Sequence, residues 1–438
     1  MQPATHDSHS HDHAQHKPGF WSNYQRFVAV GVIMMAGFSI PGAGAAPRGM
    51  HDERRKVAAF DWGGELWQLT HSGEASMHSY YDLCPWNEAG DKIVFCSYDE
   101  KRTRSKVYWM NTAGGTLHFL DQSDMVDTHS GLRQQWLPGG NKVAFSTSDE
   151  QGAFLKVIDV TTGEASRMDG ALRMLHPDGK LAVSHTNPRD EAAIARRDTE
   201  GVFVTEIASG RKSLIVTLQD AINLHPKKDN LGKSKLYIKH TKWSPDGKRL
   251  IFVLTNEIIY KGDQPRVKSI FVVNADGSGL RRILGERRWN HPSWHPDGRR
   301  ILINVGEEQG RGQGHARNPL SEMMMAYVST ETGRLEKVTE RIPGGGHHPS
   351  VSPDGRRLVT EMVTYTEGPN GRESSGTCEI IILDIEKDTV RRTTSFPLTN
   401  HSHSGTHVHP VWSRDSSSVL YNSDQSGHSE LYLLKINN

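Results

Sequence analysis

The 438-residue chain has little of what marks several common classes of protein. It has three cysteines, Cys84, Cys96 and Cys378, which are too few for a disulfide scaffold and include no Cys-x-x-Cys zinc pair. Cys84 and Cys96 flank one turn and could bridge two neighbouring strands, but buried free thiols are the interpretation we favour. The 52 Lys and Arg residues balance 51 Asp and Glu residues. This balance argues against a nucleic acid or an anionic membrane as a partner held by bulk charge.

Long hydrophobic runs are also scarce. The apolar stretch at residues 27–38 has 12 residues, whereas a membrane span needs about 20. It follows Arg26 and precedes small residues at 43–46, which is typical of a signal peptide. We therefore expect residues 1–45, a histidine-rich leader and signal peptide, to be removed on export to the periplasm or beyond. Residues 46–438 would then form a mature chain without an integral membrane segment. An over-long start and a retained N-terminal anchor are the alternatives.

Helical periodicity is nearly absent, and a short turn motif recurs in its place. In its clear form the motif is Ser or His, then Pro-Asp-Gly, and a β-rich run follows it. Proline fixes φ, and Asp and Gly tolerate the remaining turn conformations. Clear copies begin at His176, Ser244, His295 and Ser352, and weaker copies begin at Glu88, Leu137 and Ser413.

Seven such units in the mature chain have roughly 56 residues each, which is the size of a propeller blade. The sequence therefore predicts an all-β fold, a seven-bladed β-propeller in a single domain. The last unit has no outer strand of its own, and residues 57–70 are predicted to supply it and close the ring. An open β-sandwich does not explain seven turns of one type.

Histidine is abundant, with 24 residues, and several histidines share one position in the repeat. Six residues before the turn Asp stand His240, His291, His348 and His409, and Arg133 occupies the matching position in the second unit. Equivalent positions at the start of inner strands converge on the axis of a propeller. We therefore expect these side chains to cluster in space.

His407 stands two residues before His409, so strand alternation points both to one side. Several convergent imidazoles suit a divalent transition metal such as Mn, Zn, Fe or Ni, and suit Ca or Mg poorly. We predict His291, His348, His407 and His409 as metal ligands. The alternative is that a His before a Pro-containing turn only caps the repeat.

Other side chains from the early blades could face the same pocket. His78, His129 and Arg133 are predicted to bind a substrate, and Arg196 and Arg197 are candidates for the chemistry. Basic and imidazole groups converging on one pocket suit an acidic, carboxylated ligand. For the arginines a solvated loop is the alternative. Tryptophans precede the turns at 136, 243, 294 and 412, where we expect them to form blade core.

The turn repeats resemble those of TolB-type propellers, and the histidine set is similar to that of oligogalacturonate lyase. That family is a seven-bladed propeller that holds a metal by three His and one Gln and cleaves uronates by β-elimination. The closing unit with its paired histidines implies His407 and His409 as ligands, and the segment from Asn290 to Gly298 implies His291. The segment from Lys239 to Gly247 implies His240 as the active-site histidine, and the first unit resembles the family's first blade, including His78.

The chain departs from this family at two positions. Ser404 stands where the family has its Gln ligand, and water or His348 could fill the gap. Gly201 appears at the position of the family's catalytic Arg, whose place Arg196 or Arg197 could take.

Together these features predict a metal-assisted lyase acting on a uronate-containing oligo- or polysaccharide, with manganese as the favoured metal. The metal, with Arg133 or His348, would neutralise the uronate carboxylate, and His240, Arg196 or Arg197 would take the C5 proton. The alternative is a non-catalytic TolB-like periplasmic propeller that binds a protein or a glycan. The propeller of a serine peptidase is disfavoured because no Gly-x-Ser-x-Gly hydrolase segment follows.

Overall fold

The computed structural model describes residues 51–437, except 53, 72, 188–190, 258, 261–263, 286, 307–322, 368–372 and 399–405. Residues 1–45, where the leader and signal peptide are predicted, and Ser404 lie outside the described residues. Residues 46–438 cluster by their contacts into one unit, which contains every described strand and helix.

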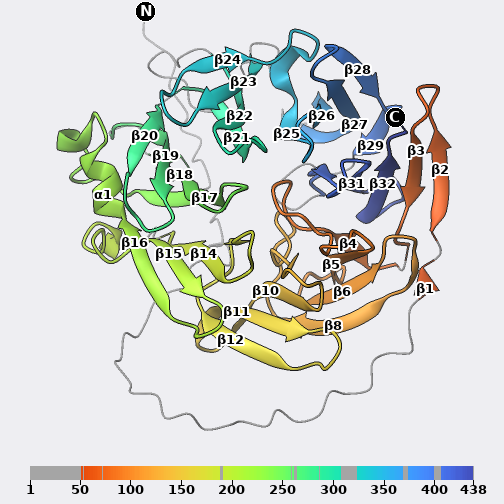
Figure 1. Cartoon of the computed structure of the whole chain (residues 1–438), viewed down its shortest axis with the longest axis horizontal. Coiled ribbons are helices and arrows are strands. Elements are labelled where there is room, and N and C mark those ends of the chain that lie inside the picture. Colours follow the sequence, from red (N-terminus) through yellow and green to blue (C-terminus); the bar gives the residue numbers. More distant parts are fainter. Residues whose placement is uncertain are drawn as a thin grey trace, which may run out of the picture. The chain divides into compact units, whose positions relative to one another are not determined.

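In the described residues, seven antiparallel sheets of four or five strands stand around an axis, which confirms the predicted propeller (Figure 1). The first blade contains β4 (Ala75–Met77), β5 (Lys92–Tyr98), β6 (Ser105–Asn111) and β8 (His118–Ser123), and the second contains β9 (Gln135–Trp136), β10 (Lys142–Asp149), β11 (Gly152–Asp159) and β12 (Ala165–Asp169). The third blade contains β13 (Met174–Leu175), β14 (Leu181–His185), β15 (Gly201–Glu206) and β16 (Lys212–Thr217), and the fourth contains β17 (Tyr237–Trp243), β18 (Arg249–Thr255), β19 (Lys268–Asn274) and β20 (Arg281–Leu284). The fifth blade contains β21 (Trp289–Trp294), β22 (Arg300–Val305), β23 (Met324–Ser329) and β24 (Leu335–Lys337). The sixth contains β25 (His347–Val351), β26 (Arg357–Glu367), β27 (Glu373–Asp384) and β28 (Thr389–Arg392), and β29 (Phe396–Leu398) pairs with β27.

The seventh blade is built from both ends of the unit. Its inner strands are β30 (Val411–Trp412), β31 (Ser418–Ser423) and β32 (Glu430–Lys435). β3 (Glu65–Gln68) pairs with β32, and β2 (Arg55–Ala59) pairs with β3, so the N-terminal segment closes the ring as predicted. This closure covers the edge that β32 would otherwise expose.

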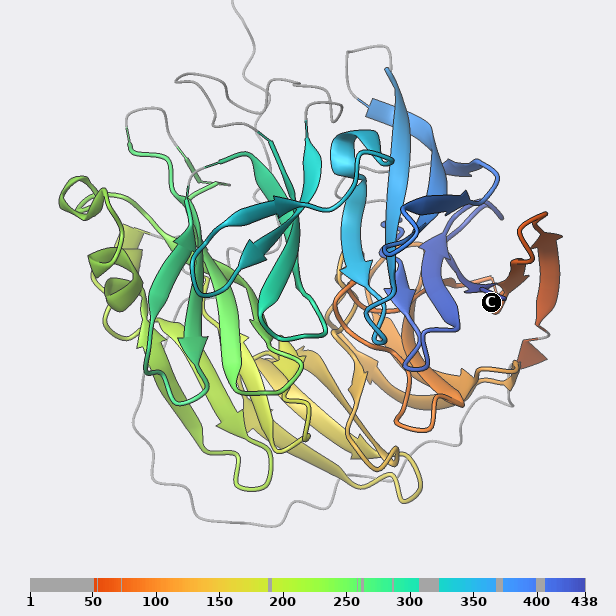
Figure 2. The ribbon, with the colours of Figure 1, turned by 45° about the horizontal axis from the view of Figure 1, so that its top comes forward.

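Among the described residues, few elements lie outside the blades. The short helix α1 (Leu218–Asn223) follows β16, and 3-10 turns occur at η2 (Glu191–Ala193), η3 (Lys228–Asn230) and η5 (Pro343–Gly345). β1 (His51–Asp52) pairs with β7 (Gly115–Thr116). The long β26–β27 hairpin of the sixth blade rises beyond its neighbours in Figure 2 (light blue).

The repeated turns have the conformations that their sequence predicts. In the fourth blade the Ser244 hydroxyl donates to Asp246 Oδ1 at 2.6 Å, and the same oxygen accepts the Lys248 N–H at 3.1 Å. The glycines that end the four clear turns all have positive φ, a region that L side chains rarely adopt: Gly179 (72°), Gly247 (70°), Gly298 (64°) and Gly355 (76°).

The core lies between neighbouring blades, because the two faces of each sheet pack on the sheets beside it. Trp136, Trp243 and Trp412 are 3–4% exposed, which confirms the prediction that these tryptophans form core. The indole of Trp294 is partly buried and donates to the Lys242 carbonyl at 3.1 Å, which links the fifth blade to the fourth.

The three cysteines are free in the structure, so Cys84 and Cys96 do not bridge the strands. Cys96 and Cys378 are buried, and burial raises the pKa of the Cys96 thiol to about 12. The interpretation as buried free thiols is confirmed for these two residues, whereas Cys84 is partly exposed.

The described residues include no helix with both the length and the apolar character needed to cross a membrane.

Candidate metal centre

The repeat position that carries the histidines has an unusual backbone conformation. Five residues there have a left-handed backbone: Arg133 (φ 54°), His240 (54°), His291 (52°), His348 (45°) and His409 (48°). In the fourth, fifth and sixth blades the pairing register shifts at this point, between Lys239 and Lys242, Asn290 and Ser293, and His347 and Ser350. A bulge of this kind redirects a side chain away from the regular pleat, and histidine tolerates positive φ better than most residues.

Five imidazole rings form one continuous cluster, the axial imidazole cluster, which consists of His129, His291, His348, His407 and His409. The ring of His129, from the β8–β9 connection, lies 4.2 Å from that of His407 and 5.1 Å from that of His409, centroid to centroid. The ring of His348 lies 4.3 Å from that of His409 and 4.0 Å from that of His291. The structure therefore brings together the four predicted ligands, and it adds His129, which was predicted to bind substrate.

The nitrogens of this cluster fit a metal. One ring nitrogen from each of His129, His407 and His409 lies within 4.8 Å of the other two. Both ring nitrogens of His409, Nε2 of His348 and Nδ1 of His291 are buried and have no hydrogen-bond partner among the described residues. A buried polar atom without a partner costs free energy, and a coordinated metal would remove that cost. An all-imidazole donor set suits a transition metal.

Burial also keeps these rings in the form that binds a metal. Desolvation holds the pKa of His291, His348 and His409 well below the usual value for histidine, and the neighbouring imidazoles lower it further. The rings are therefore neutral near pH 7, with lone pairs available for coordination.

Glu361 supports the cluster from behind. Its Oε1 lies 2.5 Å from His348 Nδ1, and both side chains are almost completely buried. A metal-binding histidine commonly donates the N–H of its second ring nitrogen to a carboxylate, and this hydrogen bond fixes the orientation of the ring. The pair leaves His348 Nε2 as the nitrogen available to a metal.

Two tyrosines from the first blade lie among the imidazoles. The Tyr80 ring is 4.6 Å from the His409 ring, 5.3 Å from that of His129 and 6.1 Å from that of His240. The Tyr81 ring is 5.0 Å from that of His348. Neither tyrosine follows from the histidine period, because the first unit has no residue of that period. Their proximity to His78 in the chain was the available signal.

A buried charge cluster adjoins the tyrosines, and no repeat or motif of the sequence predicts it. Asp82 Oδ2 lies 2.5 Å from an Arg173 guanidinium nitrogen and 2.6 Å from Lys242 Nζ. Desolvation raises the pKa of Asp82 but is outweighed by its two cations, so the net shift is downward and the carboxylate stays charged.

The other predicted residues lie in different surroundings. His240 meets the cluster through Tyr80, and the half-buried Arg133 occupies the equivalent bulge of the second blade. His78 is fully buried, and its backbone N–H donates to Asn422 Oδ1 at 3.0 Å.

The two arginines of the third blade are engaged elsewhere. Arg197 donates to the carbonyls of Leu231 and Ser234 at 2.8 and 2.6 Å, and Arg196 pairs with Glu200 at 3.0 Å. No side chain fits at Gly201, because a Cβ there would lie 1.9 Å from the Val216 carbonyl oxygen.

Gly346 delivers the chain to His347 and His348. Its φ is 62°, and an added Cβ would lie 2.3 Å from Thr360 Oγ1 and 2.9 Å from the Glu361 carbonyl oxygen. We expect Gly346→Ala to lower the free energy of unfolding by about 2–5 kcal/mol, through backbone strain and overpacking together. Urea denaturation would measure the loss. Gly355→Ala is the control, because φ there is 76° but no atom lies within 4 Å of the added Cβ. Equal losses in the two variants would contradict the steric explanation.

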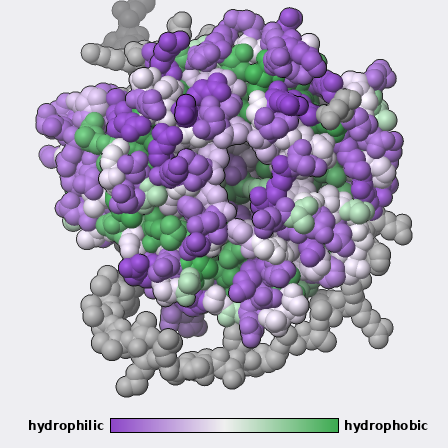
Figure 3. Space-filling view, viewed as in Figure 1, coloured by the Kyte–Doolittle hydropathy of each residue, from purple (hydrophilic) through white to green (hydrophobic). Residues whose placement is uncertain are grey.

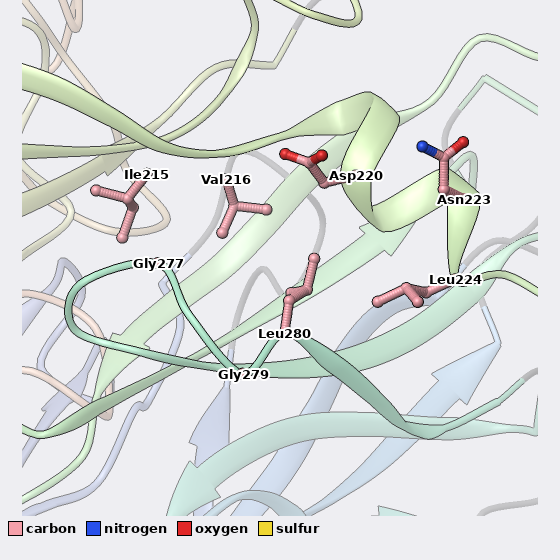
Figure 4. Close-up of a pocket in the computed structure, with 8 residues that line it drawn as sticks. All are labelled: Ile215, Val216, Asp220, Asn223, Leu224, Gly277, Gly279 and Leu280. Carbon is pink, nitrogen blue, oxygen red and sulfur yellow. The ribbon is translucent and has the colours of Figure 1, made fainter.

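The molecule is hollowed at the centre of the face seen in Figure 3, where the blades converge, and mostly hydrophilic residues surround the hollow. A separate pocket of about 440 Å³ lies between α1 and the β19–β20 turn (Figure 4). Its carboxylate, Asp220, accepts the Thr217 N–H at 2.9 Å and so caps α1. This pocket contains no histidine and no residue of the predicted site.

Comparison with known proteins supports the fold. An oligogalacturonate lyase in complex with manganese superposes with a TM-score of 0.63 at 14% identity, over 89% of this chain and 98% of that one. The oligogalacturonate lyase of Vibrio parahaemolyticus superposes with a TM-score of 0.63 at 15% identity, over 90% of this chain and 99% of that one.

Sequence comparison adds less. An uncharacterized peptidase of Bacillus subtilis (strain 168), YuxL, is 25% identical over an alignment of 145 residues that covers 27% of this chain. The match spans about a fifth of that relative's length. No protein-family model matches the chain. The strand pairing and the ring contacts together define the chain as a seven-bladed propeller with an axial imidazole cluster. Its fold resembles that of oligogalacturonate lyases.

Proposed function

We propose that this protein is a metal-dependent lyase that cleaves uronate-containing oligo- or polysaccharides by β-elimination. The axial imidazole cluster carries the proposal, because buried ring nitrogens of His291, His348 and His409 have no hydrogen-bond partner among the described residues. One ring nitrogen from each of His129, His407 and His409 also lies close enough to the other two to share a divalent transition metal. The fold shared with oligogalacturonate lyases supports the choice of an acidic glycan as substrate.

His129, His407 and His409 would hold the metal, with His348 and His291 beside them. A bound divalent metal would act as a Lewis acid toward the uronate carboxylate. Manganese is the first choice because a similar structure contains it, and Zn, Fe and Ni are the alternatives.

His240 is the base that we favour. Burial holds its pKa well below the usual value, so the imidazole is unprotonated near pH 7 and can accept the C5 proton. The C4–O bond then breaks, a C4–C5 double bond forms, and the protonated imidazole can return the proton to the departing oxygen. Arg133 would hold the carboxylate. Arg196 and Arg197 suit the role of base less well, because a guanidinium is hard to deprotonate and theirs are already engaged.

Polygalacturonate, its oligomers and other uronate glycans, incubated with manganese-loaded protein, test the proposal. We expect an unsaturated product with at least one of them, detected by its ultraviolet absorbance. His240→Asn keeps a residue that tolerates positive φ, and it should lower kcat by about 10²–10⁴-fold without changing metal content.

His118→Asn is the matched control, because this ring stacks on Trp109 at 3.7 Å, away from the cluster, and kcat should not change. Absence of product from every uronate glycan, with metal bound, would contradict a lyase. It would favour a TolB-like propeller that binds a protein or a glycan. Export to the periplasm or beyond remains part of the proposal, and N-terminal sequencing of the mature protein would test it.

A further inference from the structure

One carbonyl oxygen next to the imidazole cluster receives two hydrogen bonds from other blades. The Tyr81 hydroxyl of the first blade donates to the Pro292 carbonyl oxygen at 2.9 Å. Lys242 Nζ of the fourth blade donates to the same oxygen and to the Tyr81 hydroxyl oxygen, the latter at 2.8 Å. Pro292 belongs to the fifth blade and directly follows His291.

The Pro292 carbonyl needs these donors because the sheet does not supply them. His291 has φ 52°, and the pairing of β21 with β22 shifts its register between Asn290 and Ser293. The regular ladder is therefore interrupted at Pro292, where a buried carbonyl still requires a partner. The two donors satisfy the carbonyl and tie the bulge that carries His291 to two other blades.

The charges behind this contact are expensive to bury. The side chains of Lys242, Asp82 and Arg173 are 1–5% exposed. Desolvation lowers the pKa of Lys242 to about 8, against the opposing effect of Asp82. A buried ion pair seldom stabilises a fold more than well-packed apolar residues of the same volume would. Its physical advantage is directional, because charged hydrogen bonds hold their partners in one geometry.

We infer that Tyr81 and Lys242 are positioning residues, which hold the left-handed bulge of the fifth blade so that His291 faces the metal. Asp82 holds Lys242 in place, and Arg173 in turn pairs with Asp82. The inference rests on the proposed metal-dependent function, but it concerns the orientation of one imidazole and can be tested with or without a metal.

Tyr81→Phe is the decisive variant, because it removes one hydroxyl and keeps the ring that contacts His291 and His348. We expect the Kd for Mn²⁺, measured by isothermal titration calorimetry, to rise about 10–100-fold, as for other residues that orient metal ligands. The melting temperature should change by only a few degrees. Tyr327→Phe is the matched control: this hydroxyl of the fifth blade is buried without a partner among the described residues, and its loss should leave the Kd unchanged.

A second measurement uses the metal-free protein. Diethyl pyrocarbonate should modify His291 several-fold faster in Tyr81→Phe than in the wild type or Tyr327→Phe, as followed by peptide mass spectrometry. Faster modification with no metal bound to any variant would support the positioning role and contradict the proposed function. An unchanged Mn²⁺ affinity in a metal-binding protein, or an unchanged modification rate, would overturn the inference.

Discussion

Replacing His409 with asparagine is expected to weaken the binding of Mn²⁺ about a hundredfold or more. His409 lies at the centre of the cluster, with its ring 4.3–5.3 Å from those of His348, His129 and His407. Removing one ligand from a preformed site should cost about 3 kcal/mol of binding free energy, which is roughly a hundredfold in Kd. Asparagine tolerates the φ of 48° at this position, so the backbone can stay as it is.

Isothermal titration calorimetry on metal-free protein would measure this effect, and metal analysis of the purified variant would provide a second measure. His118→Asn should bind Mn²⁺ as the wild type does. If His409→Asn also kept its full affinity, the axial cluster would not be the metal centre, and the repeat-capping interpretation of these histidines would be favoured.

The metal-free protein is expected to lose stability steeply between pH 6.5 and pH 3. Burial lowers the pKa of His78 and of His185 to about 3, and Arg133 and Arg173 also disfavour the charged form of His185. Both histidines have their ordinary pKa near 6.5 in the unfolded chain. Below that pH the imidazoles of the unfolded chain bind protons that the folded protein does not bind, so acid favours unfolding.

Each of these imidazoles contributes about 1.4 kcal/mol per pH unit within that window. At pH 5 the two together should remove roughly 4 kcal/mol from the free energy of unfolding at pH 7. Urea denaturation at the two pH values, in the presence of a chelator, would measure the difference. His185→Gln should reduce the difference by roughly 2 kcal/mol, the contribution of one such imidazole, whereas His71→Gln, at an exposed position, should leave it unchanged. Equal stability of the wild type at pH 5 and pH 7 would contradict the prediction.

The propeller could be predicted from the sequence because its signals are local and repeated. Each turn depends on proline, aspartate and glycine at adjacent positions, and the closing role of residues 57–70 follows once the last unit lacks an outer strand. The histidine period could be predicted for the same reason, since a period along the chain becomes a circle in space. The positive φ shared by Arg133 and the four histidines shows that this period has a backbone cause.

The rest of the site has no such period. Tyr81 meets Pro292 across 211 positions of the chain, and Lys242 meets Tyr81 across 161. Glu361 lies in a strand where nothing in the local pattern distinguishes it from other polar residues. Arg197 carried the right charge for a catalytic group, but two nearby carbonyls accept its guanidinium hydrogens.

By itself, the sequence determined the number of blades, the closing segment and the ring of histidines, because turn chemistry and repeat spacing depend on neighbours in the chain. Only the tertiary structure decided which imidazoles lie close enough to bind one metal ion, and that His129 is among them. It also decided which buried charges hold these imidazoles in place. Those contacts depend on the closure of seven blades around one axis, which brings together residues that no local interaction connects.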